Sequence, residues 1–387
     1  MEVAYLLLGF LTALFAGKSV CLVDIKAKSN VSKPVNSTKY SGVVPTPQVQ
    51  PLVVVEEVLW QSGEAEVGIY RCPLITYTPG GNLLAVAEGR KSNGDADLKF
   101  IATKRSTDGG FEWGIQKFIH NDQYGESEDN LGAVLVDDIM KEIYIFYVTC
   151  AHPSACSSSS TPSLMYVKSV DDGISWKLPK KFAPHKGRLI VCGHGGELSV
   201  NGNFCLLSDD HGLTWRWGAE MLPIPAYTTN QKGDFVPDEC QPIELPDGSM
   251  MLNTRNQYHY HCNCRMVSRS YDGMETIDLE TVYFDTTLIE PAVAASIVSH
   301  WGMVFFSNPA SETSRTNMMV KWSFDNGTTW PGRLPIWDLA SGYSCMTAFP
   351  DTFEFEKRKY LYLLFEKGKT SYTETISFVK ISLRGII

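Results

Sequence analysis

Short apolar runs, broken by glycine, proline, aspartate or asparagine, recur from about residue 50 to the end of the chain. Clear examples are residues 83–87, 142–148, 250–253, 303–306 and 361–365. Each run has about the length of a β-strand, and no stretch of about twelve residues shows the 3.6-residue period of an amphipathic helix. The pattern predicts an all-β fold with many short strands and tight turns.

Two segments precede this β-rich region. Residues 4–17 are apolar but shorter than the roughly 20 residues of a membrane-spanning helix. Residues 1–20 are therefore predicted to be a signal peptide, cleaved between Ala16 and Cys21, although Glu2 stands where a basic residue is usual. Residues 21–49 are polar and without a period, which is typical of a flexible lead-in. The predicted folded domain spans residues 50–387, and no transmembrane segment is expected once the signal is removed.

One motif, Ser-x-Asp-x-Gly-x-x-Trp, is repeated along the predicted domain. Complete copies begin at Ser106, Ser169, Ser208 and Ser323, and a degenerate copy begins at Ser270. Its Asp can accept backbone N–H bonds across a turn, its Gly can adopt positive φ, and its Trp can anchor the turn. The motif is therefore predicted to be structural, because a carboxylate used in a turn is not free for catalysis.

The spacing of the motif indicates the architecture. Successive copies start 63, 39, 62 and 53 residues apart, close to a four-stranded propeller blade of about 40 to 50 residues plus loops. Dividing the predicted domain by this unit gives about six blades.

Composition excludes some classes of protein. The chain has 43 acidic and 34 basic residues, a formal charge of −9, and no long basic run, so nucleic-acid binding is not expected. Ten cysteines in 387 residues are too few for a disulfide scaffold, although Cys150 and Cys156 flank a loop and could pair. Glycosylation acceptors at Asn30, Asn36 and Asn326 agree with entry into the secretory pathway.

The repeated motif is the Asp box of sialidases, and the chain from about Gln50 to Ile387 resembles the animal lysosomal sialidase (neuraminidase) family. The segments that carry the resemblance are Tyr70-Arg71-Cys72-Pro73, Glu88-Gly89-Arg90-Lys91, Gly187-Arg188-Leu189-Ile190-Val191-Cys192-Gly193-His194-Gly195, Asp238-Glu239-Cys240-Gln241-Pro242, Ser341-Gly342-Tyr343-Ser344 and Glu366-Lys367-Gly368. The resemblance implies a six-bladed β-propeller with its site on the central axis. It also implies an exo-α-sialidase that removes terminal sialic acid from glycoproteins, oligosaccharides or glycolipids.

Arginines are the expected substrate-binding residues. Sialic acid carries a carboxylate on its anomeric carbon, and the planar guanidinium matches a carboxylate with two hydrogen bonds. By resemblance, Arg71, Arg255 and Arg315 match the arginine triad of the family. They are far apart in sequence, so only a converging fold can bring them together. Arg90 is a further candidate contact to the sugar.

A tyrosine is the expected nucleophile, since a carboxylate would face the negative charge of the substrate, and sialidases are known to use tyrosine. Tyr343 matches this nucleophile, and Glu239 matches the base that takes the phenol proton. Asp95 is the expected general acid and base, with Asp97 as an alternative because a polar loop containing glycine can shift register. Glu366 matches the family residue that orients the first arginine.

No metal or cofactor is expected. His259, His261, Cys262 and Cys264 could suggest zinc, but their alternation is typical of a strand and lacks the usual spacing of zinc ligands. Residues 193–196, Gly-His-Gly-Gly, lack the Lys-Ser/Thr and the helix that follow in a phosphate-binding loop, and we expect a turn there.

One interval departs from the family. Trp176 is only eleven residues before Gly187, where family members carry a Pro/Gly-rich stretch. We expect an inner strand or a site-lining loop of that blade to be lost or replaced, with reduced or absent activity as one outcome. A non-catalytic propeller that binds sialylated glycans or a protein is therefore an alternative function. A propeller glycosidase for neutral sugars is a third, but it would have no use for three convergent arginines.

The resemblance also bears on location and partners. It implies the lysosome and a protective partner resembling a serine carboxypeptidase. Residues 383–387, however, lack the Tyr-x-x-hydrophobic sorting signal of the family. A secreted or cell-surface location therefore remains open.

Overall fold

The computed structural model describes residues 52–92, 99–119, 128–150, 163–177, 186–195, 202–210, 212, 214–224 and 234–383. In these residues nearly all regular structure is β-strand, and the helix α2 (Phe355–Arg358) is a single turn. The predicted all-β class is confirmed. All five apolar runs named above lie in strands, and no helix of the described residues is long and apolar enough to cross a membrane.

The first large sheet has seven strands, which form two groups joined by one bridge. Its strands are β2 (Ile69–Tyr77), β3 (Leu83–Arg90), β4 (Lys99–Ser106), β5 (Lys117–Ile119), β6 (Glu128–Asp137), β7 (Glu142–Cys150) and β8 (Ser163–Ser169). Within the described residues, β4 pairs with β6 at one position, where a parallel bridge joins Lys99 to Glu128. All other pairings in the sheet are antiparallel.

Two smaller sheets follow along the chain. The first contains β9 (Lys186–Gly195), β10 (Gly202–Asp210) and β11 (Arg216–Met221). The second contains β12 (Pro237–Glu244), β13 (Met250–Asn256), β14 (Cys264–Ser270) and β15 (Asp278–Ile289). Strand β12 contacts β9 of the smaller sheet, so the two sheets adjoin through these strands.

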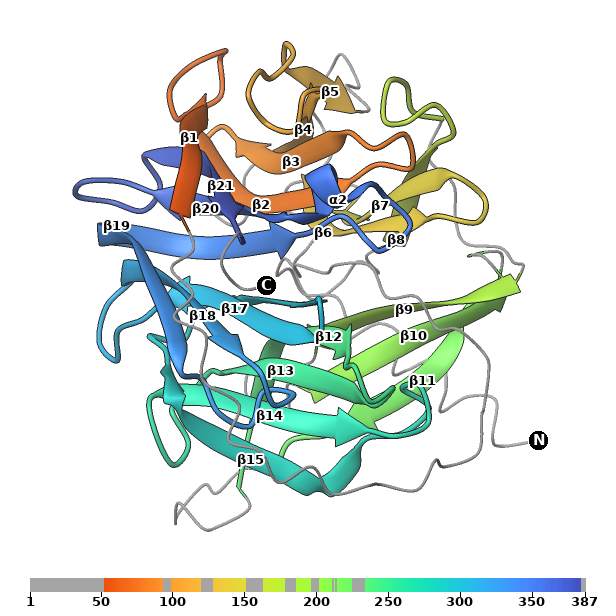
Figure 1. The fold of residues 1–387 in the computed structure, drawn as a ribbon, viewed down its shortest axis with the longest axis vertical. Helices are drawn as coiled ribbons and strands as arrows, with labels where there is room; N and C mark the ends of the chain where they lie inside the picture. The colour runs from red at the N-terminus through yellow and green to blue at the C-terminus, as the bar shows by residue number, and fades with distance from the viewer. Residues whose placement is uncertain are drawn as a thin grey trace.

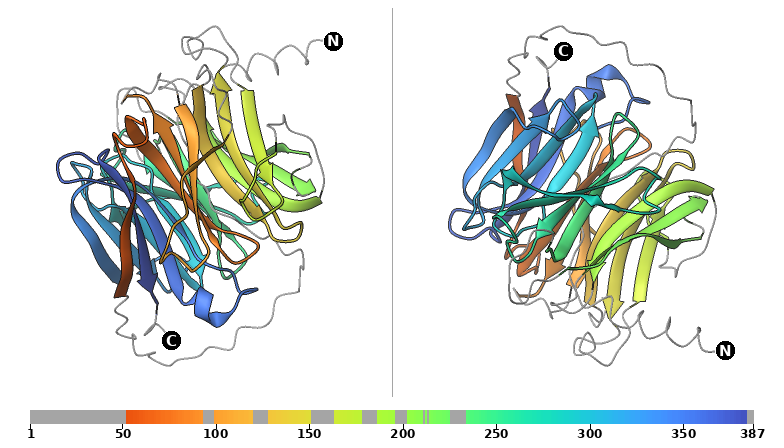
Figure 2. Two further views of the ribbon diagram at one scale, coloured as in Figure 1. Left: turned by 90° about the horizontal axis from the view of Figure 1, so that it is seen from above. Right: turned by 90° about the horizontal axis from the view of Figure 1, so that it is seen from below.

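The second seven-stranded sheet joins both ends of the described chain. Its strands are β1 (Leu52–Gln61), β16 (Ser296–His300), β17 (Met303–Pro309), β18 (Thr316–Ser323), β19 (Gly332–Thr347), β20 (Tyr360–Lys367) and β21 (Thr375–Ser382). β19 pairs with β18 through its first part and with β20 through its second part. β1 pairs with β21, and the two lie together at one edge in both views of Figure 2.

The sheets are arranged around the middle of the molecule, with the N-terminal strands at the top of Figure 1 and the strands of the central region below. None of the sheets is closed. β3 and β13 are buried at every position, because neighbouring sheets cover them. Leu83 and Leu84 of β3, for example, share a core with Phe378 of β21. The number of blades stays a prediction.

The Asp boxes form turns as predicted. In the first box, the hydroxyl of Ser106 donates to Asp108 (2.8 Å), and Asp108 accepts the backbone N–H of Phe111 (2.9 Å) and of Glu112 (3.0 Å). Gly110 has φ of 90° and donates its N–H to the Ser106 hydroxyl (2.8 Å). The same Ser-to-Asp bond recurs in the other copies, at Ser169, Ser208, Ser270 and Ser323.

The degenerate copy keeps this geometry without the usual residues. Met274 stands at the glycine position with φ of 65° and donates its N–H to Ser270 (3.0 Å). Ile277 replaces the tryptophan. The hydrogen bonds between Ser270, Asp272 and Thr276 (2.6 to 3.0 Å) therefore hold the turn even without glycine at position 274.

The shortened interval coincides with a sheet of three strands. In the box at Ser270 the turn connects the third and fourth strands of its sheet, β14 and β15. The box at Ser208 instead connects β10 to β11, which are the second and third strands of theirs. Within the described residues, this sheet therefore has no counterpart of β12. Residues 178–185, directly before β9, lie outside the described part of the chain, so the expected loss of an inner strand stays a prediction.

The hairpin of β9 and β10 corrects one prediction. Residues 193–195 are not a turn but the end of β9, where His194 is paired with Asn203. A disulfide joins Cys192 to Cys205, which are also cross-strand partners. The glycines suggested a turn, but the antiparallel ladder to β10 determines the local structure.

Candidate active site

Most of the predicted site residues lie on strands that belong to different sheets. Arg71 is on β2, Glu239 on β12, Arg255 on β13, Tyr343 on β19 and Glu366 on β20, while Arg315 directly precedes β18. The hydrogen bonds and ring contacts described below connect all six. Asp95, Asp97 and the predicted partner of Cys150, Cys156, lie outside the described residues, so these predictions stay untested.

Glu366 connects Arg71 to the backbone beside Tyr343. Its carboxylate is fully buried and accepts the Nε–H of Arg71 (2.5 Å) and the backbone N–H of Cys72 (3.2 Å) through Oε1. Its other oxygen accepts the backbone N–H of Tyr343 (3.0 Å). A Cβ on Gly342 would lie 2.1 Å from this oxygen, so a glycine is needed for the close approach.

Glu239 connects Tyr343 to Arg255. Its Oε1 accepts a hydrogen bond from the phenol hydroxyl of Tyr343. Its Oε2 accepts a hydrogen bond from Nη1 of Arg255 (2.6 Å). Glu239 is only 2% exposed. A single buried carboxylate thus touches both a phenol and a guanidinium, with one oxygen for each.

Arg315 approaches the same tyrosine from another side. Its guanidinium carbon lies 5.6 Å from the ring centre of Tyr343 and 5.0 Å from that of Tyr372. Arg71 makes the same two contacts, at 5.5 and 5.3 Å. The two arginines therefore share two aromatic rings, an arrangement in which the negative faces of the rings partly offset the cationic charge.

The charges in the site follow from these contacts. Burial alone would lower the pKa of Arg71 and of Arg255, but Glu366 and Glu239, respectively, raise each pKa above its ordinary value. Burial alone would raise the pKa of Glu239, but Arg255 and His194 bring it below its ordinary value. The arginines are therefore cations and Glu239 is an anion at neutral pH.

Tyr343 keeps its proton in this environment. Burial and the negative charge of Glu239 raise its pKa well above the ordinary value, and Arg255 only partly opposes them. The resting site thus pairs a neutral phenol with an ionised carboxylate that accepts its hydrogen bond. This is the arrangement in which a base removes the phenol proton only as the oxygen begins to react.

Arg90 contacts Cys72, the residue after Arg71. Its Nε contacts Glu88 Oε1 at 2.5 Å, and its Nη2 contacts the sulfur of Cys72 at 3.9 Å. The Cys72 thiol is buried, and burial followed by the charge of Glu88 raises its pKa to about 12, so it remains a neutral thiol. Arg90 is 3% exposed, and its described contacts are to the protein.

The residues considered for zinc are arranged differently from a metal site. Cys262 and Cys264 form a disulfide, so their sulfurs are not thiolate ligands. The ring of His261 contacts the backbone oxygen of Asp234 through Nε2 (2.9 Å).

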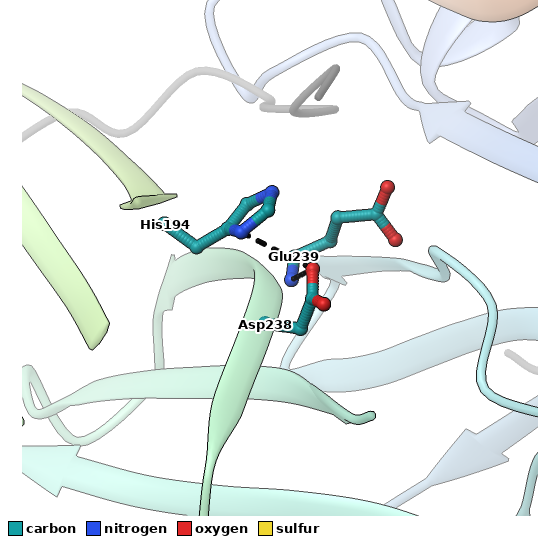
Figure 3. A group of neighbouring side chains, drawn as sticks. All are labelled: His194, Asp238 and Glu239. Atoms are coloured by element: carbon teal, nitrogen blue, oxygen red, sulfur yellow. Dashed lines mark hydrogen bonds and ion pairs between the residues drawn. The ribbon is translucent and has the colours of Figure 1, made fainter. Parts of the chain in front are cut away.

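Glu239 also belongs to a cluster with His194 and Asp238 (Figure 3). His194 lies on β9, and its Nδ1 is 3.2 Å from Oδ1 of Asp238. The same oxygen accepts the backbone N–H of Glu239 (2.8 Å). The sequence motifs pointed to neither His194 nor Asp238 as site residues, because their contact depends on how β9 packs against β12.

Comparisons with known proteins identify the family. Residues 81–377, more than half of the chain, match the family model described as a BNR repeat-like domain. The chain therefore belongs to the BNR repeat-like family.

Two of its relatives are named sialidases. The sialidase of Micromonospora viridifaciens is 28% identical over 383 residues, which covers 86% of this chain and 56% of the relative. The sialidase of Bacteroides fragilis is 25% identical over 340 residues, which covers 74% of this chain and 59% of the relative. The chain thus spans little more than half the length of these two relatives.

Solved structures agree on the fold. The microbial sialidase Hz136 has a TM-score of 0.67 and 22% identity, covering 86% of this chain and 69% of its own. The intramolecular trans-sialidase of Ruminococcus gnavus, in complex with oseltamivir carboxylate, has a TM-score of 0.62 and 15% identity, covering 85% and 97%. At these identities the likeness concerns the fold.

Proposed function

We propose that the protein is an exo-α-sialidase with a tyrosine nucleophile and a retaining mechanism. The observation that carries the proposal is the carboxylate of Glu239, which contacts both the hydroxyl of Tyr343 and the guanidinium of Arg255. Arg71 and Arg315 flank the ring of the same tyrosine. The relatives named sialidases support this function.

The chemistry assigns one task to each group. Arg71, Arg255 and Arg315 bind the carboxylate of the sugar. The oxygen of Tyr343 attacks the anomeric carbon while its proton passes to Glu239, and the bond to the leaving oxygen breaks as that oxygen receives a proton. By resemblance Asp95 donates this proton and afterwards removes one from the water that attacks the anomeric carbon. The bond between that carbon and Tyr343 then breaks, and Glu239 returns its proton to the phenol oxygen.

The neutral phenol is suited to this substrate. An ionised carboxylate nucleophile would be repelled by the carboxylate of the sugar at a distance of a few ångströms. Tyr343 carries no charge until Glu239 takes its proton, so the repulsion is avoided during binding. The two steps each invert the anomeric carbon, and together they retain its configuration.

The proposed architecture is a six-bladed propeller. The first seven-stranded sheet divides into two blades at the single pairing of Lys99 with Glu128. The second divides within β19, where the register is irregular between Ser341 and Ser344. Tyr343 lies in this irregular segment, at the transition between two blades.

The motif resemblance supports an enzyme of the animal lysosomal type, acting on sialylated glycoproteins, oligosaccharides or glycolipids. A lysosomal location and a protective partner resembling a serine carboxypeptidase follow from the same resemblance.

The test is hydrolysis of a fluorogenic sialoside by the purified chain and by Tyr343→Phe. Removing a nucleophile is expected to lower kcat by at least about a thousandfold. Tyr271→Phe is the matched control, since Tyr271 is 69% exposed and has none of the site contacts described above. Equal activity of Tyr343→Phe and the wild type, with both proteins folded by circular dichroism, would contradict the proposal.

A non-catalytic sialoglycan-binding protein is the second candidate, favoured by the three-stranded sheet of β9, β10 and β11. It would keep the arginines as a carboxylate site. Calorimetry with an unsaturated sialic-acid analogue separates the two functions, because binding without turnover of any sialoside supports the second.

A further inference from the structure

The residue next to the proposed base is tied to a histidine of another sheet. Asp238 is 1% exposed, and its Oδ1 lies within hydrogen-bonding distance of both His194 Nδ1 (3.2 Å) and the Glu239 backbone nitrogen (2.8 Å). The side chain of His194 is 6% exposed. One carboxylate oxygen therefore links β9 to the backbone of the residue that contacts Tyr343.

The hairpin of β9 and β10, which contains His194, makes a second contact with Asp238. Asn203, the cross-strand partner of His194, donates from Nδ2 to the backbone oxygen of Asp238 (2.6 Å). Its side-chain oxygen accepts from the hydroxyl of Thr254 (3.1 Å), the residue before Arg255. The hairpin thus supports both Glu239 and Arg255, and the nearby disulfide fixes its register.

A metal ion is not the best explanation of the cluster. Figure 3 shows the carboxylate of Glu239 pointing away from that of Asp238. Both Glu239 oxygens have partners, Tyr343 and Arg255, and an ion would have to displace them. The geometry fits a support for Glu239 better than a set of ligands.

We propose that His194 and Asp238 form a positioning pair for Glu239. The proposal rests on the proposed function, because it concerns the base of that reaction. Neither residue touches the reacting atoms in this role. The pair acts through Glu239, by orienting its backbone and by placing a positive charge beside it.

The charges around Glu239 agree with this role. Four groups from four strands face it or its partners: His194 from β9, Asp238 from β12, Arg255 from β13 and Tyr343 from β19. Burial has the largest effect on the Glu239 pKa and raises it. Arg255, and after it His194, lower this pKa. Arginine stays charged at all relevant pH values, whereas histidine gains its charge between about pH 8 and pH 5.

A positive charge favours the ionised carboxylate, so loss of His194 raises the Glu239 pKa. The base then becomes protonated at a higher pH, and the acidic limb of the kcat/KM profile moves upward. A shift of about half to one pH unit, which one neighbouring charge can produce, lowers kcat/KM about threefold to tenfold below the limb. Well above the limb, the change should be smaller than about twofold on the same reasoning.

The test measures kcat/KM from pH 4 to pH 8 for the wild type, His194→Gln, Asp238→Asn and the double variant. His194→Gln should move the acidic limb upward. Asp238→Asn removes a negative charge beside Glu239 together with the partner of His194, so the acidic limbs of Asp238→Asn and of the double variant should lie below that of His194→Gln. His300→Gln is the control, since His300 is also buried but contacts the backbone oxygen of Arg358. An equal loss of kcat/KM at every pH in His194→Gln, or an acidic limb at the same pH as in the wild type, would overturn the proposal.

A second measurement does not need turnover. In a protein with isotope-labelled histidines, the NMR signal that disappears in His194→Gln is the signal of His194. In Asp238→Asn the titration of this signal should move to lower pH, because the carboxylate that favours the imidazolium is gone. An unmoved titration would overturn the pair even if the enzyme is active. If the wild type cleaves no sialoside, the proposed function fails, and the NMR result still decides whether the histidine and the aspartate are coupled.

Discussion

At the scale of single residues, the three arginines of the site are held in different ways. Arg71 and Arg255 each contact a buried carboxylate, Glu366 or Glu239. The described contacts of Arg315 are two aromatic rings and the backbone oxygen of Ala292 (3.4 Å). The charge of Arg315 is therefore the least neutralised of the three and the most available to an incoming anion.

This difference predicts that substitution of Arg315 mainly lowers activity, whereas substitution of Arg71 lowers folding stability. Arg315→Ala should lower kcat/KM about tenfold to 150-fold, through loss of a charge-assisted bond of about 1.5 to 3 kcal/mol. Its folding stability should change little, because no buried carboxylate loses its partner. Arg71→Ala should instead lower the free energy of unfolding by about 3 to 5 kcal/mol, since Glu366 would remain buried and unpaired. Urea unfolding and steady-state kinetics measure both, and equal destabilisation by the two variants would contradict the distinction.

The sequence could indicate some of these residues and not others. Arg71, Glu239 and Tyr343 lie in short motifs that are legible without a structure. Tyr372 has no such motif, and its place between two arginines depends on a turn that brings it against Gly342. His194 was predicted to lie in a turn because of its flanking glycines, yet its pairing with Asn203 places it in a strand.

At the scale of elements, the Asp-box turns are local and were therefore predictable. Their hydrogen bonds join residues at most four positions apart, so the motif contains all the partners that it needs. What the turns touch is not local. In the first box a Cβ on Gly110 would lie 2.4 Å from the ring of Phe378, whereas on Gly173 in the second it would lie 3.4 Å from Leu84.

Alanine at these two glycines separates backbone strain from steric conflict. Both have similar positive φ, 90° and 78°, so each substitution should cost about 1 to 2 kcal/mol in backbone strain. Gly110→Ala should cost about 1 to 3 kcal/mol more, because the buried ring of Phe378 must move. The comparison is made by urea unfolding, and equal losses would show that the contact with Phe378 is absorbed without cost.

At the scale of the whole molecule, the two ends of the described chain meet in one sheet. β1 covers the edge of β21, and its residues Leu59 and Trp60 are buried. Trp60 also donates from its indole nitrogen to the side chain of Gln116 (2.6 Å). The first strand therefore joins the last strand to the first Asp-box region, a link that its apolar pattern alone could not reveal.

Removing this strand should destabilise and oligomerise the protein. A chain beginning at residue 62 leaves the backbone groups of β21 unpaired at an open edge, and such edges pair with other chains. Light scattering should detect association, and thermal unfolding should begin at a lower temperature. A chain beginning at residue 51 retains β1 and is the control. A monomeric shortened chain with unchanged unfolding would contradict this role of β1.

The cross-link between Cys192 and Cys205 makes the environment in which the chain matures relevant to its chemistry. It closes a 13-residue interval in the hairpin whose His194 and Asn203 contact Asp238, and a bond of this kind is worth about 3 kcal/mol. Compartments rich in glutathione keep such thiols reduced, whereas the lumen of the secretory pathway oxidises them. A preparation made in a reducing host would thus start with a looser support beneath Glu239 than one made in an oxidising host.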